Sequence, residues 1–198
     1  MSRFIETIRA ENGITGSLDL HQERVNRTLR DWGADGHVDL SETLGAVSIP
    51  AHPVCRVRVE YDLSGILQVS FFEYVIKSIR NIRLVDIGGR EYRYKYADRE
   101  WIHSLVHTSG CDEIIMMRDN WITDASIANL AFYNGAEWIT SDTPLFQGTR
   151  RQYLLENGLI REAPVRRSDL SSFHLVKLIN AMIPWTESPE LPISMVRG

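Results

Sequence analysis

Cysteine pairs and long apolar runs are both missing from this 198-residue chain. Cys55 and Cys111 lie far apart and form no CxxC motif, so we expect two reduced, buried thiols. No apolar run approaches the roughly 20 residues that a membrane-spanning helix needs. Residues 1–13 contain acidic side chains and no apolar core, which argues against a signal peptide. These absences predict a cytoplasmic protein without a membrane segment.

Lysine is also scarce, because only Lys77, Lys95 and Lys177 are present and the other nineteen of the 22 basic residues are arginines. Any chemistry that needs a lysine amine therefore has three candidates. Acidic residues outnumber basic ones and give a net charge of −4, which argues against nucleic acid as the main partner. Hydrophobic residues make up 43% of the chain, as expected for a globular protein that can bury a core.

The first part of the chain shows the patterns of one helix and two paired strands. Apolar and charged residues alternate over residues 55–61, which predicts a half-buried strand, and a glycine turn leads into a second strand at 66–75. Helical spacing of apolar residues predicts a helix over residues 20–32, which Ser17 or Asp19 would cap.

The rest of the chain mixes strands and helices without a regular βαβ repeat. The strongest turn signal, Asn134-Gly135, predicts a hairpin, and Ser168 is expected to cap a short helix. We therefore predict an α+β fold with a small lobe over residues 1–81 and a larger lobe over residues 82–198. The other predicted strands lie at residues 4–9, 113–117, 121–123, 160–165 and 173–182, and the other helices are one that bears Trp101, Leu105 and Val106 and one at residues 149–157.

Several familiar catalytic motifs are absent from the sequence, including the GxSxG, Walker A and GxGxxG patterns. His103 and His107 stand four residues apart on a predicted helix, the spacing of two metal ligands. No third ligand such as the glutamate of HExxH accompanies them, so we interpret both as exposed helix histidines and expect no metal site.

Three features of the sequence together meet the needs of one cofactor. Lys95 lies among aromatic residues, Asp124 directly follows a predicted strand, and Gly148-Thr149 opens a predicted helix whose free amides could bind a phosphate. Arg24 on the first helix could add a fixed positive charge. A lysine, an acid and a phosphate cradle are what a protein must supply to pyridoxal phosphate. The aromatic residues around the lysine are Tyr92, Tyr94 and Tyr96.

The same segments resemble a known family in their order and spacing. They are similar to motifs of the class IV aminotransferases, which include branched-chain and D-amino-acid aminotransferases and 4-amino-4-deoxychorismate lyase. The resemblance implies the two-lobed architecture of fold-type IV pyridoxal-phosphate enzymes, with residues 82–198 as the cofactor-binding lobe. The segments that carry it are FIETIRAENG (4–13), LHQERVNRTL (20–29), KYADREW (95–101), ITDASIANLAF (122–132), TPLFQGTRRQYLL (143–155) and INAMIPW (179–185).

Site residues follow from this resemblance position by position. Lys95 would bind the cofactor as a Schiff base and, once released, act as the general base. Asp124 stands where the family usually has glutamate and would face the pyridine nitrogen. Asn129 lies in a matching motif, and we interpret it as structural. The residues that match positions around the cofactor phosphate are Arg24, Thr149, Arg150 (through its backbone amide), Asn180 and Ala181.

The resemblance also implies an activity and a partner. The ETIR-like opening and the INAMIP segment favour the 4-amino-4-deoxychorismate lyase branch, which releases pyruvate and leaves 4-aminobenzoate for folate synthesis. A class IV amino-acid aminotransferase and a non-catalytic relative are the alternatives, and a homodimer is the expected assembly.

The substrate pocket is the part of the site that the sequence defines least. Family members usually have an additional amino-terminal segment and a longer region than residues 31–80, so we expect a reduced small lobe with a more open pocket. Arg56, Arg58 or Arg99 could bind substrate carboxylates, although exposed strand and helix charges are the commoner interpretation.

Overall fold

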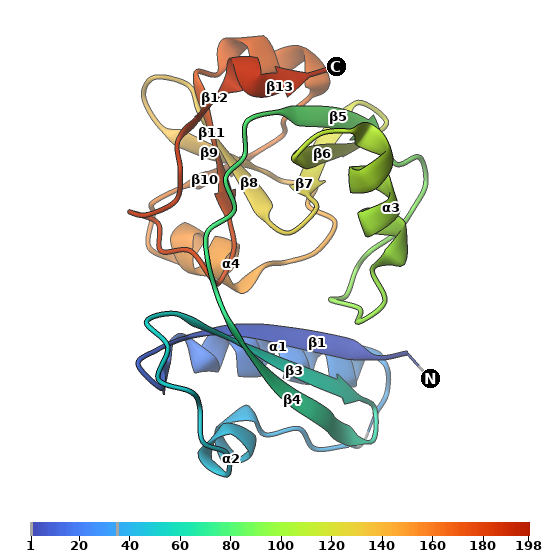
Figure 1. The fold of residues 1–198 in the computed structure, drawn as a ribbon. Coiled ribbons are helices and arrows are strands. Elements are labelled where there is room, and N and C mark those ends of the chain that lie inside the picture. Colours follow the sequence, from blue (N-terminus) through green and yellow to red (C-terminus); the bar gives the residue numbers. More distant parts are fainter. Residues whose placement is uncertain (1, 35) are drawn as a thin grey trace. The chain divides into compact units, whose positions relative to one another are not determined.

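The structure, a computed structural model, describes residues 2–34 and 36–198 and contains two compact units (Figure 1). The first unit comprises Met1–Ile76 together with Tyr94–Asp98, and the second comprises Lys77–Arg93 together with Arg99–Gly198. Both units mix helices with mainly antiparallel sheets, so the predicted α+β class is confirmed. The boundary predicted near residue 82 had assigned Tyr94–Asp98 to the second lobe.

The first unit is a four-stranded antiparallel sheet in the order β2-β1-β3-β4. The predicted hairpin is present between β3 and β4. Gly65 lies at its turn with φ of 145°, and residues other than glycine rarely adopt this backbone conformation. The elements of this unit are β1 (Phe4–Glu11), β2 (Ile14–Thr15), α1 (Leu18–Asp31), α2 (Leu40–Gly45), β3 (Cys55–Asp62) and β4 (Gly65–Glu73).

Helix α1 packs on one face of this sheet because alternate strand residues are apolar. Val57 and Val59 of β3 are fully buried in one cluster with Val25 and Leu29 of α1. Ser17 stands at the cap position of α1 in a left-handed conformation, but its side chain makes no capping hydrogen bond, so that part of the prediction is wrong. The short helix α2 was not predicted from the sequence.

The second unit contains two sheets, in the orders β10-β9-β8-β11-β12 and β13-β5-β6-β7. Strands β7 and β8 follow each other through a tight turn, which places the segments after Asp124 and before Asn129 side by side. The elements of this unit are β5 (Ile82–Asp86), α3 (Glu100–Ser109), β6 (Glu113–Arg118), β7 (Trp121–Ala125), β8 (Asn129–Tyr133), β9 (Trp138–Ser141), α4 (Thr149–Glu156), β10 (Arg161–Ala163), β11 (Leu175–Ile179), β12 (Leu191–Pro192) and β13 (Val196–Arg197), with 3₁₀ helices at Arg167–Ser172 and Ile193–Met195.

Most predicted elements of this unit are confirmed, with shorter bounds for two strands. Strand β10 is shorter than predicted, and β11 ends at Ile179 because residues 180–183 form a turn in which the Ile183 amide donates to the Asn180 carbonyl. Strand β5 was not predicted, and it pairs in parallel with β6. The predicted cap at Ser168 is wrong, since the Asp169 carboxylate accepts the Arg166 amide at 2.8 Å.

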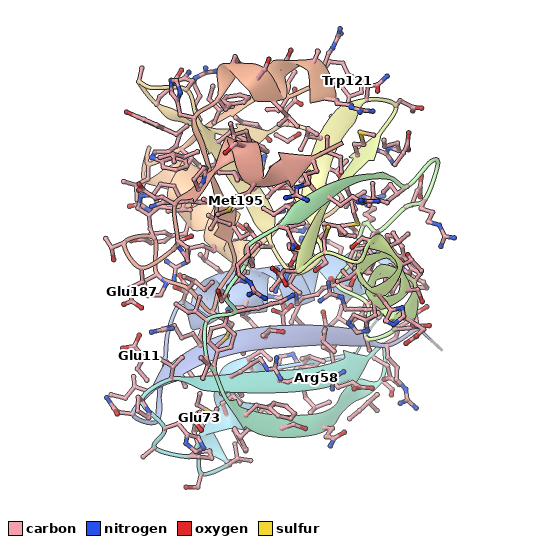
Figure 2. The ribbon with its side chains drawn as sticks, turned by 45° about the horizontal axis from the view of Figure 1, so that its top comes forward. Glu11, Arg58, Glu73, Trp121, Glu187 and Met195 are labelled. Carbon is pink, nitrogen blue, oxygen red and sulfur yellow. The ribbon has the colours of Figure 1, made fainter. Side chains whose placement is uncertain are left out.

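Trp121, labelled in Figure 2, begins β7 beside the 3₁₀ helix at Arg167–Ser172. The guanidinium carbon of Arg166 lies 4.3 Å from the centre of the Trp121 ring, and the two residues form an isolated β-bridge. This contact fixes the start of β7, which contains Asp124 rather than ending before it as the sequence predicted.

Cys55 is buried and Cys111 is half-buried, and neither forms a disulfide. Within residues 2–34 and 36–198 no helix has both the length and the apolar character that crossing a bilayer requires.

Candidate functional site

Lys95 lies at the centre of a three-residue turn in the first unit. The Tyr96 amide donates to the Tyr94 carbonyl at 3.0 Å, and the Lys95 carbonyl accepts the Ile5 amide of β1 at 2.9 Å. The ring centres of Tyr94 and Tyr96 lie 6.1 and 5.5 Å from that of Phe4. The strand edge and these rings therefore fix the backbone that carries the lysine.

The aromatic group predicted around Lys95 is divided between the two units. Tyr94 and Tyr96 belong to the first unit, whereas Tyr92 packs against Trp101 and Phe146 of the second unit at ring distances of 6.0 and 6.1 Å. Adjacent positions in the sequence suggested one cluster, but the chain passes from one unit to the other between residues 92 and 94.

The other two lysines have structural partners. The Lys177 ammonium lies 3.2 Å from a Glu190 oxygen and 4.2 Å from the ring centre of Trp185, and it also faces Trp138 at 5.0 Å. The Lys77 ammonium donates to the Asp112 carbonyl. Lys177 is 5% exposed, so its amine is committed to a buried cation–π and ion-pair site.

Arg24 belongs to a buried polar cluster with Glu6 and His21. Its Nε donates to one Glu6 oxygen at 2.9 Å and an Nη donates to the other at 2.5 Å. The His21 Nδ1 lies 2.6 Å from the second oxygen, and the three residues are at most 6% exposed. This bidentate arrangement fixes the plane of the guanidinium.

Electrostatics in this cluster follow from burial and from the ion pair. Burial by itself would raise the pKa of Glu6, but the Arg24 charge and the hydrogen bonds from His21 and Arg24 lower that pKa to about 2. Burial lowers the pKa of His21, and the positive charges of Arg24 and Lys95 contribute in the same direction. At neutral pH the cluster therefore holds ionised Glu6, cationic Arg24 and neutral His21, within electrostatic range of Lys95.

Sequence reasoning did not identify Glu6 and His21. A signal was present for Glu6, because the two-residue period of a strand places it on the same face as Phe4 and Ile8. A charged residue on a buried face requires a partner, and Arg24 on the helix above that face provides it.

Asp124 is a buried acid of the second unit, with 2% of its surface exposed. One carboxylate oxygen accepts the amides of Leu145 and Phe146 at 2.8 and 3.3 Å, and the other accepts the Asn129 side chain at 2.6 Å. Burial raises the pKa of Asp124 to about 6, although these hydrogen bonds favour the ionised form. The acid is therefore mostly ionised at neutral pH.

The predicted phosphate segment begins helix α4 in the same unit. Gly148 precedes the helix, and its carbonyl accepts the Gln152 amide at 2.9 Å, so the amides of Thr149 and Arg150 lie in the first turn of the helix. Thr149 is 4% exposed. The Arg150 guanidinium stacks on Tyr153 at 5.4 Å, which leaves the backbone amide as the group suited to a phosphate.

Asn180 and Ala181 lie in the turn after β11. The Asn180 carboxamide accepts the Met182 amide at 2.9 Å and donates to the Ile127 carbonyl at 3.4 Å. Its side chain thus connects this turn with the turn between β7 and β8. Because the Asn180 side chain already makes these two hydrogen bonds, a phosphate at Asn180 and Ala181 would be bound by their backbone groups.

The three arginines considered for substrate carboxylates have different environments. Arg58, labelled in Figure 2, pairs with Glu60 at 2.7 Å. Arg99 donates to the Ser126 carbonyl. The Arg56 guanidinium stacks on Phe72 at 4.7 Å, and its buried Nε has no hydrogen-bond partner among residues 2–34 and 36–198.

His103 and His107 are both exposed on α3, which agrees with their interpretation as surface residues.

Comparisons with known proteins show which family this chain belongs to. The sequence profile described as amino-transferase class IV matches residues 93–189. An uncharacterized protein of Haemophilus influenzae is 36% identical over 186 residues, which cover 92% of this chain and 98% of that protein. The crystal structure of a candidate 4-amino-4-deoxychorismate lyase from Haemophilus somnus superposes with a TM-score of 0.83 at 30% identity, covering 92% of this chain and 97% of the other.

A more distant structure shares the fold alone. The pyridoxal-phosphate-bound form of a hypothetical aminotransferase from Mycobacterium tuberculosis has a TM-score of 0.78 at 15% identity, covering 96% of this chain and 80% of that one. The identity and coverage of the nearer relatives, together with the matched profile, show that this chain belongs to the amino-transferase class IV family.

Proposed function

We propose that this chain is a pyridoxal-phosphate-dependent lyase that converts 4-amino-4-deoxychorismate into pyruvate and 4-aminobenzoate. The observation that carries the choice of reaction is the 30% identity, across nearly the whole of both chains, with a protein that is itself named as a candidate for this activity.

Each unit offers groups that suit one part of the cofactor. A phosphate dianion requires fixed cationic and amide donors, and Arg24 is a guanidinium held by two hydrogen bonds to Glu6. The first turn of α4 offers the amides of Thr149 and Arg150. A ring nitrogen requires an ionised acid shielded from water, and Asp124 is buried and mostly ionised at neutral pH.

Each of these residues would have a separate task. Lys95 would hold the cofactor covalently and, after release by the substrate amine, take the proton from the carbon that bears this amine. Arg24 and the amides of Thr149 and Arg150, with the turn at Asn180 and Ala181, would bind the phosphate. Asp124 would keep the ring nitrogen protonated. When bound, pyridoxal phosphate supplies the electron sink for the carbanion that forms when this proton leaves.

The lyase reaction balances without an oxidant or reductant. Lys95 would take the proton from the amine-bearing ring carbon, and the neighbouring carbon–oxygen bond would then break, so that the ring becomes aromatic. The leaving group would depart as the enol form of pyruvate, its oxygen taking the proton that Lys95 removed, and the Lys95 amine would then displace the amine of 4-aminobenzoate from the cofactor. In an aminotransferase the same Lys95 would return the proton to the cofactor, so the site residues do not distinguish the two reactions and the substrate pocket does.

The test begins with the visible absorption spectrum of the purified chain, in which bound cofactor gives a band that is lost on borohydride reduction. Peptide mapping after reduction should place the label on the peptide that contains Tyr94, Lys95 and Tyr96. Lys95→Ala should abolish the label. A label on Lys77 or Lys177 would contradict the assignment.

The reaction itself is tested by offering 4-amino-4-deoxychorismate and, separately, pairs of amino and keto acids. Pyruvate and 4-aminobenzoate from the first, without amino transfer in the second, are the expected result. Amino transfer alone would support the class IV aminotransferase alternative, and absence of both reactions with cofactor bound would support a non-catalytic relative.

A further inference from the structure

The Asp124 carboxylate has most of its acceptor capacity occupied by the protein. A carboxylate offers about four lone-pair sites, two on each oxygen. Oδ2 accepts two backbone amides, from Leu145 and Phe146. Oδ1 accepts only the Asn129 side chain among residues 2–34 and 36–198. The remaining acceptor site of the acid is therefore on Oδ1, the oxygen to which Asn129 donates.

Asn129 also connects this acid with the segment that opens α4. Its Nδ2 donates both to Asp124 Oδ1 at 2.6 Å and to the Phe146 carbonyl at 3.1 Å. Its Oδ1 lies close to the backbone of Gly148, so that a Cβ added at Gly148 would be 2.1 Å from this oxygen. Asn129 is 2% exposed, so water does not compete for these contacts.

We propose that Asn129 is a positioning residue for the cofactor ring: it directs the open acceptor site of Asp124 Oδ1 towards the ring nitrogen and fixes the acid relative to the first turn of α4. This inference rests on the proposed function. Without the Asn129 donor, only the two amides at Oδ2 hold the carboxylate of Asp124, so Oδ1 is no longer fixed in direction and the cofactor ring nitrogen loses a fixed partner. Gly148 is part of this arrangement, because only glycine at this position leaves space for the Asn129 carboxamide.

The experiment compares two probes on the full-length chain: pyridoxal phosphate and its 1-deaza analogue, in which carbon replaces the ring nitrogen. Asn129→Ala should weaken binding of pyridoxal phosphate by roughly 10- to 100-fold, the effect of losing one hydrogen bond to a charged group. Binding of the analogue should hardly change, because it has no ring nitrogen for Asp124. A purely structural role of Asn129 would weaken both probes equally, and that result would overturn the inference.

Gly148→Ala provides an independent variant, because it removes no polar group and displaces Asn129 by contact. It should reproduce the selective loss of pyridoxal phosphate binding. Gly89→Ala is the matched control, since an added Cβ there meets no atom within 4 Å, and both probes should bind it as they bind wild type. If Asn129→Ala does not fold by circular dichroism, Asn129→Ser and Gly148→Ala carry the same comparison.

A cofactor-free measurement separates this inference from the proposed function. Carboxyl-carbon NMR of the apo chain should show that Asn129→Ala raises the pKa of Asp124 above the wild-type value of about 6, because the ionised form loses a donor. An unchanged pKa would overturn the inference even if wild type binds the cofactor. Failure of wild type to bind either probe, with the expected rise in pKa, would contradict the proposed function and with it the ring-positioning role.

Discussion

Replacing Glu6 with glutamine tests how the buried cluster stabilises the first unit. The side chain keeps its shape but loses the charge that pairs with Arg24. In the folded chain the pKa of Glu6 is lowered from 4.5 to about 2. That difference corresponds to about 3 kcal/mol of stabilisation, at about 1.4 kcal/mol for each pH unit. Removing one partner of a buried ion pair costs a similar amount, about 3–5 kcal/mol.

The pH dependence gives the sign of the effect. Because the folded-state pKa of Glu6 is the lower one, its stabilisation is complete above the unfolded-state value of 4.5 and is lost as the pH falls towards about 2. Glu6→Gln should therefore be about 3 kcal/mol less stable than wild type at pH 7, and the difference should shrink steadily below pH 5. Asp124 titrates in both proteins, so its contribution cancels in the comparison.

Urea denaturation at several pH values, followed by far-ultraviolet circular dichroism, measures this difference. Glu137→Gln is the matched control. Glu137 also pairs with an arginine through both oxygens, at 3.0 and 2.8 Å to Arg161, but this pair is exposed to solvent. The control should change stability very little. Equal stabilities of Glu6→Gln and Glu137→Gln at pH 7, or a Glu6→Gln deficit that persists unchanged at pH 3, would refute the reasoning.

Three further substitutions address the cofactor residues and the excluded lysine. Asp124→Asn should weaken cofactor binding at least as much as Asn129→Ala and reduce turnover by a still larger factor, because the ring nitrogen loses the charge that keeps it protonated; equal losses in kcat and in affinity would argue against that role. Arg24→Lys keeps a charge beside Glu6 but loses the planar fork, so pyridoxal phosphate should bind roughly tenfold more weakly while pyridoxal, which has no phosphate, binds as before. Lys177→Met should lower stability by about 1–2 kcal/mol through loss of its cation–π and ion-pair contacts, yet leave borohydride labelling at Lys95 intact, and a lost label would implicate Lys177 in the site.

Local patterns in the sequence were enough to predict most elements of both units. The alternation over residues 55–61 depends only on which side chains avoid water, and the structure places β3 there with the apolar residues buried. The motifs around Lys95 and Asp124 are also local, and they led to the family that the comparisons show. The helix α2 and strand β5 were not predicted, because each is short and receives its partners from distant segments.

Contacts between distant residues depend on how the helices and strands pack. Glu6 and Arg24 come together only because α1 packs on the face of β1 that carries the glutamate. The sequence periodicity of each element predicts its buried face, but it does not predict which residues of the two faces meet. The contact between Asn129 and Gly148 likewise depends on the path of the chain between β8 and α4. The local elements could be predicted from residue types alone, because they follow from short-range sterics and burial. Only the folded chain determined the ionisation of Glu6 and Asp124, because a pKa depends on every charge and donor that packing brings near.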